Sequence, residues 1–129
     1  MSSLNIAASS LNDFKWEYRI VVAQVDELSL GEFERDLKPQ LSQLSDYRLI
    51  VFAVLDKEIK VYGATFEESF DSEFRASLVK QLAGKEVALI GFDGGVKRRY
   101  GWSDFSWEAV YFLIDTMPMR QAELRSRDL

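Results

Sequence analysis

The residues best suited to do chemistry are carboxylates that follow expected strands. Asp26 and Glu27 come directly after the β-branched run 20–25, and Asp93 follows the apolar run 87–92. Carboxylates gathered at strand ends can act as a general acid and base, or hold a divalent cation through oxygen ligands. A carboxylate at a helix start also caps free backbone N–H groups. We favour capping within a solvated acidic loop, and keep the carboxylate enzyme as the alternative.

A second group of residues is basic and aromatic, and lies toward the C-terminus. Alternation along a strand places Lys97 and Arg99 on one face of the sheet. The other face then carries Val96, Arg98 and Tyr100. This charge either discourages pairing of an edge strand with other sheets or forms a patch for an anionic ligand or acidic partner. For the aromatic residues we favour packing in the core and at the helix start, and keep a binding surface as the alternative, because exposed aromatics concentrate binding energy. The candidate binding residues are Lys97, Arg98, Arg99, Trp102, Phe105 and Arg120.

The composition excludes several kinds of chemistry. The chain of 129 residues contains no cysteine and no histidine. It therefore has no redox dithiol, no thiol nucleophile and no Ser-His-Asp triad. We predict no cofactor and no bound metal. The formal net charge of −5 disfavours nucleic acid, whose phosphate backbone an acidic protein repels. No apolar run is long enough for a transmembrane segment.

The first half of the chain predicts a strand, a helix and a second strand. Residues 20–25 form a short β-branched run that is typical of a buried strand. Ser29 followed by Glu32 is the pattern of a capping box at a helix start. Pro39 falls inside this helix and should bend it, because proline cannot donate the helical hydrogen bond. Residues 49–55 are apolar on both faces, which favours a central strand.

The second half predicts a hairpin followed by a helix. Asp93-Gly94-Gly95 supplies the positive φ angles that a tight hairpin turn needs. The other expected elements are a weaker strand over 59–62, a helix from Asp71 or Ser72 to Gly84, strands over 87–92 and 96–100, and a last helix from Ser103 or Asp104 to Pro118.

The order of these elements predicts an α/β fold of thioredoxin-like type. The core reads β-α-β-α-β-β-α, with a mixed central sheet and helices on both faces. We expect one domain over residues 16–120, a flexible N-terminal tail over 1–15 and a polar C-terminal tail over 121–129. A thioredoxin would carry its reactive pair at residues 26–29, where this chain has only a helix cap.

Two motifs near the C-terminus resemble one family. The segment ALIGFDGGVK (88–97) and the segment FLIDTMPMR (112–120) are similar to an uncharacterised thioredoxin-like domain. That domain occurs in bacterial, often exported, proteins and as the Equarin and SRPUL type of repeat in vertebrate matrix proteins. The likeness spans about Tyr18 to Arg125, and Arg98 departs from the apolar residue common there.

This resemblance brings no activity and no catalytic residues to carry over. It implies a periplasmic or extracellular location, while the sequence leaves a cytoplasmic one open. We therefore expect a non-catalytic binding or scaffold module whose partner is a protein or a glycan. The alternative is a carboxylate enzyme, with or without a divalent metal, at the C-terminal ends of the strands around Asp26, Glu27 and Asp93.

Overall fold

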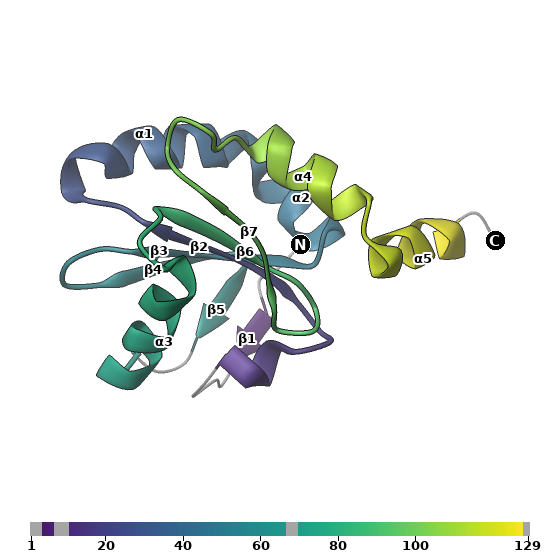
Figure 1. The fold of residues 1–129 in the computed structure, drawn as a ribbon, viewed down its shortest axis with the longest axis horizontal. Helices are drawn as coiled ribbons and strands as arrows, with labels where there is room; N and C mark the ends of the chain where they lie inside the picture. The colour runs from purple at the N-terminus through teal and green to yellow at the C-terminus, as the bar shows by residue number, and fades with distance from the viewer. Residues whose placement is uncertain (1–3, 7–10, 67–69, 128–129) are drawn as a thin grey trace.

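The computed structural model describes residues 4–6, 11–66 and 70–127, which form a mixed α/β architecture (Figure 1). A five-stranded sheet runs through the centre, in the order β4-β3-β2-β6-β7. β2 and β3 are parallel, and every other neighbouring pair in this sheet is antiparallel. Its strands are β2 (Arg19–Gln24), β3 (Leu49–Val54), β4 (Ile59–Tyr62), β6 (Val87–Ile90) and β7 (Val96–Tyr100).

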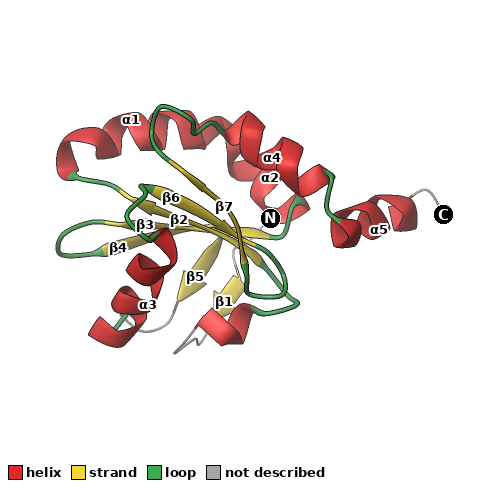
Figure 2. Cartoon of the chain, viewed as in Figure 1, coloured by secondary structure: helices red, strands yellow, loops and turns green. Residues whose placement is uncertain are grey.

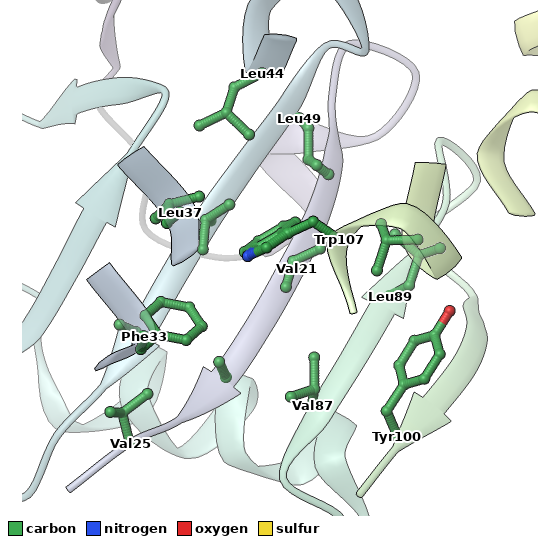
Figure 3. Close-up of a cluster of buried hydrophobic side chains, with 14 of the residues drawn as sticks. Val21, Val25, Phe33, Leu37, Leu44, Leu49, Val87, Leu89, Tyr100 and Trp107 are labelled. Carbon is green, nitrogen blue, oxygen red and sulfur yellow. The ribbon is translucent and has the colours of Figure 1, made fainter. Parts of the chain in front are cut away.

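The sheet is covered on both faces, because its central strands are apolar on both faces. α1 (Glu27–Leu37), α2 (Leu41–Asp46) and α4 (Trp107–Asp115) lie over one face (Figure 2). α3 (Ser72–Leu82) lies over the other. All six residues of β3 are buried, as expected for a central strand. The two cores therefore share the sheet, and Figure 3 shows the one under α1 and α4, which contains Phe33 and Trp107 together with Val21 and Leu89.

The first helix begins and breaks for local reasons. Asp26 is its N-cap, and the Asp26 carboxylate accepts a 2.8 Å hydrogen bond from the Ser29 backbone N–H. Ser29 completes the capping box, so the expected pairing of Ser29 with Glu32 is wrong and the helix begins at Glu27. Pro39 perturbs the helix where expected, but breaks it instead of bending it: the short 3-10 turn η2 (Lys38–Gln40) separates α1 from α2.

The N-terminal stretch expected as a flexible tail contains regular structure where it is described. β1 (Leu4–Ile6) pairs in parallel with β5 (Ala64–Phe66). A 3-10 turn, η1 (Leu11–Phe14), then buries Phe14 completely, with its ring centroid 5.9 Å from that of Phe52. Residues 1–3 and 7–10 of that expected tail lie outside the described residues.

The C-terminal part also differs from expectation. The N-cap of α4 is Ser106, rather than Ser103 or Asp104. The helix ends at Asp115, and Pro118 begins another helix, α5 (Pro118–Arg127). Proline is favoured at a first helical position because its missing N–H has no partner there in any case. The stretch from 121, expected as a polar tail, is thus helical up to Arg127. Within the described ranges, no helix is both long and apolar enough to cross a bilayer.

Candidate functional site

The three candidate carboxylates do not meet. Asp26 and Glu27 follow the C-terminal end of β2, whereas Asp93 follows β6, which runs antiparallel to β2. Ile90 pairs with Ile20 near the start of β2, so Asp93 lies at the opposite end of the sheet. The expectation that these three residues form one acidic site at the strand ends is therefore not met by the fold.

The carboxylates at both ends already have partners. The Ser29 hydroxyl donates to the Asp26 carboxylate at 2.8 Å, and this bond lowers the pKa of Asp26. Lys97 Nζ lies 2.8 Å from the Asp93 carboxylate and, with the Gly95 N–H, lowers the pKa of Asp93. A general acid or base works best with a pKa near the working pH. These shifts move both groups away from it.

A hollow of about 730 Å³ adjoins the ends of β2 and β3, beside Asp26 and Glu27. Its lining mixes those acids with Lys57 and Arg75. The Arg75 guanidinium donates to the backbone carbonyl of Leu55 and so braces the turn after β3. Among the residues that the structure describes, no cluster of acidic groups suited to a metal ion is found.

Strand alternation divides Arg98 and Arg99 between the two faces of β7, and a β-bulge precedes them. Leu89 pairs with Arg98, but the next residue of β6, Ile90, pairs with Val96. Lys97 is left as the extra residue of the bulge. Val96 therefore packs, half-buried, against the core under α3, and the prediction that it shares a face with Arg98 is wrong.

The exposed basic side chains of this strand have separate local partners. Lys97 pairs with Asp93, as described above. Arg99 Nε donates to the carbonyl of Gln81 at the end of α3, 2.8 Å away. The Arg98 guanidinium lies over the Tyr100 ring, 5.3 Å from its centroid. These contacts suit a charged edge strand and gather no common basic patch.

Arg120 lies apart from the other candidates and is buried. Only 3% of it is exposed, and it forms ion pairs with three carboxylates at 3.0–3.2 Å. These belong to Asp46, Asp115 and Glu123. Burial opposes the charge, but these hydrogen bonds outweigh it and raise the pKa of Arg120. Arg120 therefore anchors α5 instead of facing a ligand.

A second buried arginine, Arg19, was missed by sequence reasoning. Arg19 is 1% exposed and pairs with Glu123 at 3.1 Å. It also donates to the Tyr47 carbonyl and lies over the Phe92 ring, 4.1 Å from its centroid. Burial lowers the pKa of Arg19, against the opposing effect of Glu123. Glu123 thus joins both buried arginines, and no local pattern could have indicated this.

The aromatic candidates Trp102 and Phe105 do share a site, but with acidic partners. They line a groove of about 340 Å³ between α1 and the loop that joins β7 to α4. Trp102 is 40% exposed, whereas Phe33 and Trp107 are buried. We call this site the aromatic–acidic groove. Its lining residues are Ser29, Glu32, Phe33, Asp36, Trp102, Phe105 and Trp107.

The rings of the groove meet edge to face. The Trp102 centroid lies 6.1 Å from that of Phe33 and 5.8 Å from that of Phe105, with interplanar angles of 71° and 85°. Phe105 and Trp107 are 5.2 Å apart at 77°. Such perpendicular contacts are favourable for aromatic pairs and hold the rings in fixed orientations. The rings thus form walls set at steep angles to one another.

The groove is negatively charged at its rim. Glu32 and Asp36 lie one turn apart on α1, and both are exposed. None of the described residues that line the groove is basic. Arg35 approaches Glu32 at 3.6 Å, but both side chains are more than two-thirds exposed. Such a pair is weak, because water screens it.

Trp107 lines the groove and also carries an unsatisfied buried polar atom. Its indole Nε1 is buried and, in the described part of the chain, has no hydrogen-bond partner. The nitrogen points from α4 toward α1, on the side of Phe33 and Leu37 (Figure 3). Tyr111, one turn further along α4, is buried likewise, and burial raises its pKa to about 12. A buried donor without an acceptor costs free energy, so these two groups make the packing of α4 less stable than full hydrogen bonding would.

The acidic half of the groove was missed by sequence reasoning. The signal is the spacing of Ser29, Glu32 and Asp36, which repeats at three and four residues and so marks one helix face. It runs beside the apolar stripe of the same helix, which includes Phe33. Only the fold, however, brings this face to Trp102.

Comparison with known proteins finds one family. The family described as a domain of unknown function (DUF4174) matches residues 10–123. Neither a curated protein nor a solved structure matches the chain.

Proposed function

Because the chain belongs to the DUF4174 family, a domain of unknown function, we propose its role from its own geometry. The proposed role is that of a non-catalytic binding module whose ligand occupies the aromatic–acidic groove. The observation that carries this proposal is the position of Trp102. This large side chain stays 40% exposed while its ring is held edge to face by Phe33 and Phe105. A rigid, partly exposed tryptophan is a typical anchor of a binding surface.

A thioredoxin-like fold used without redox chemistry is part of the same proposal. The order β3-β2-β6-β7, with β2 and β3 parallel and the other pairs antiparallel, supports it. So do helices on both faces of the sheet. The chain has no cysteine, so thiol–disulfide exchange is outside its chemistry. The place of the reactive pair holds the cap formed by Asp26 and Ser29.

The observations weigh against the carboxylate enzyme. Asp93 is separated from Asp26 and Glu27 by the length of the sheet. The pKa values of Asp26 and Asp93 are lowered rather than raised. Three points stay predictions. They are the class of partner, the absence of nucleic acid among the ligands, and the location outside the cytoplasm.

Site-resolved spectroscopy tests the groove directly. The chain has three tryptophans, and ¹⁵N-labelled protein gives one indole N–H signal for each. Trp16 lies before β2, whereas Trp102 follows β7 at the opposite end of the sheet. Trp16 is therefore an internal control. A library of cationic, anionic and neutral fragments should contain compounds that shift the Trp102 signal and leave the Trp16 signal in place.

Two variants distinguish specific binding at the groove from non-specific binding to exposed tryptophan. Trp102→Ala should abolish binding of these compounds, and Trp16→Ala, which removes another exposed tryptophan, should not. Circular dichroism would first establish that both variants fold. If no compound moves the Trp102 or Trp107 signal, or if Trp16 responds equally, the groove is not a binding site and the proposal is wrong.

A further inference from the structure

We propose that the aromatic–acidic groove binds a basic side chain, lysine or arginine, from an exposed segment of a partner protein. This inference rests on the proposed function, because it names the ligand of the same groove. It reverses the charge expected of the partner from the sequence, since the basic strand β7 does not line the groove.

Charge complementarity is the first support. Two carboxylates, Glu32 and Asp36, lie on the rim, and no lysine or arginine is found among the lining residues. Within the described part of the chain Asp36 forms no ion pair, while Glu32 has only the exposed contact with Arg35. A partner cation can replace Arg35 at little cost, because such exposed pairs contribute little. An anionic partner would meet uncompensated repulsion.

The arrangement of the rings is the second support. A cation is attracted to the face of an aromatic ring, and several rings set at angles form a cage around it. Trp102, Phe105 and Trp107 meet at 85° and 77°, which gives walls instead of one flat platform. A pyranose ring would stack best on a flat platform. The geometry therefore favours a compact cationic group over a neutral glycan.

The surroundings of the groove favour a protein as the source of the cation. Leu28 directly precedes the lining residue Ser29 and is 96% exposed. Together with Trp102, it adds exposed apolar surface next to the groove. Such surface is characteristic of protein interfaces, where apolar anchors surround a specific contact. A small ammonium compound would leave Leu28 uncovered.

Binding of defined probes to the whole chain tests the inference. The probes are hexalysine, hexaglutamate, the neutral glycan chitohexaose and tetramethylammonium chloride, each at the same ionic strength. We expect hexalysine to shift the indole signal of Trp102, with no shift of Trp16. The Glu32→Gln/Asp36→Asn variant should bind hexalysine roughly 3- to 30-fold more weakly, as expected for loss of two exposed ion pairs.

A matched variant controls for net charge. Glu17→Gln/Asp56→Asn removes the same two charges at exposed positions outside the groove, and should change the dissociation constant by less than about twofold. Equal weakening by both variants would mean diffuse attraction and would overturn the inference. So would tetramethylammonium binding as tightly as hexalysine through the same carboxylates, because the ligand would then be a small ammonium compound.

The outcomes separate this inference from the proposed function. If chitohexaose or hexaglutamate shifts Trp102 and hexalysine does not, the groove is a binding site but its ligand is not a basic side chain. If neither these probes nor the wider fragment library moves Trp102, both proposals fall.

Discussion

The rings of Phe33 and Trp102 meet nearly perpendicularly, with centroids 6.1 Å apart, and join α1 to the loop after β7. Phe33 also lies 6.2 Å from Trp107 and 6.5 Å from Tyr62. One side chain of α1 therefore contacts the buried Trp107, the exposed Trp102 and the edge strand β4. Both the shape of the groove and the packing of the core therefore depend on Phe33.

We predict that Phe33→Ala destabilises the fold by about 3–5 kcal/mol, the usual effect of removing a buried phenylalanine. Phe33 is 6% exposed, so a cavity would remain beneath Trp102. Urea unfolding followed by circular dichroism measures the change. Phe112→Ala is the matched control, because Phe112 is 75% exposed and should change stability by less than about 0.5 kcal/mol. Equal losses in both variants would contradict the packing described.

Glu123→Gln should destabilise the protein by about 3 kcal/mol, because it leaves two buried arginines with one carboxylate fewer. Glu123 pairs with Arg19 at 3.1 Å and with Arg120 at 3.2 Å. Thermal and chemical unfolding measure the change. Arg125→Gln is the control on the same helix, since Arg125 is exposed, and it should stay within about 0.5 kcal/mol. If Glu123→Gln left the free energy of unfolding unchanged, α5 would not be held by this pairing.

The protein should lose stability in acid, in part through Asp46. Burial raises the pKa of this group, but hydrogen bonds from Arg120 and Arg127 overcome that effect and lower it. The unfolded chain then binds more protons, so this stabilisation is complete above the unfolded pKa, near 4, and declines as the pH falls through the folded pKa. Denaturant titrations at several pH values should give Asp46→Asn a shallower decline than the wild type. An unchanged decline would assign acid sensitivity to Asp26 and Asp93 instead.

Two glycines should respond to alanine in opposite directions. A Cβ at Gly31, inside α1, would meet nothing within 4 Å, so Gly31→Ala should stabilise the protein by about 0.5–1 kcal/mol. Gly63 has a φ of +92°, and a Cβ there would lie 2.7 Å from the Leu49 carbonyl oxygen. Gly63→Ala should therefore destabilise by at least about 1 kcal/mol. Differential scanning fluorimetry measures both, and a shift of the same sign in both variants would contradict the backbone geometry.

Elements with local signals could be predicted from the sequence. The β-branched runs around Val21 and Val51 form the central parallel strands, and Asp93-Gly94-Gly95 turns the hairpin as expected. Pro39 breaks its helix because proline has no N–H to donate to the preceding turn, which is a local effect. These features depend on neighbours in the chain, which a single sequence displays.

Features that depend on distant contacts could not be predicted. The bulge at Lys97 changes which face Val96 occupies, and alternation alone does not show it. Arg120 looks like an exposed charge until Asp46 and Asp115 are brought around it. The groove combines a part that could be predicted from the sequence with a part that could not. Its aromatic half was a candidate, while its acidic half comes from a helix more than sixty residues earlier, placed there by the sheet.

The ion pair between Arg19 and Glu123 has a consequence for biosynthesis. Arg19 begins the central strand β2, and its carboxylate partner follows 104 residues later. While the ribosome is still making the chain, β2 emerges with a cation that has no counter-ion. The nascent sheet cannot close over Arg19 without burying an unpaired charge, which is strongly unfavourable. Closure of the sheet over Arg19 is therefore expected to follow the emergence of α5 from the exit tunnel, and chaperones have that interval in which to hold the domain.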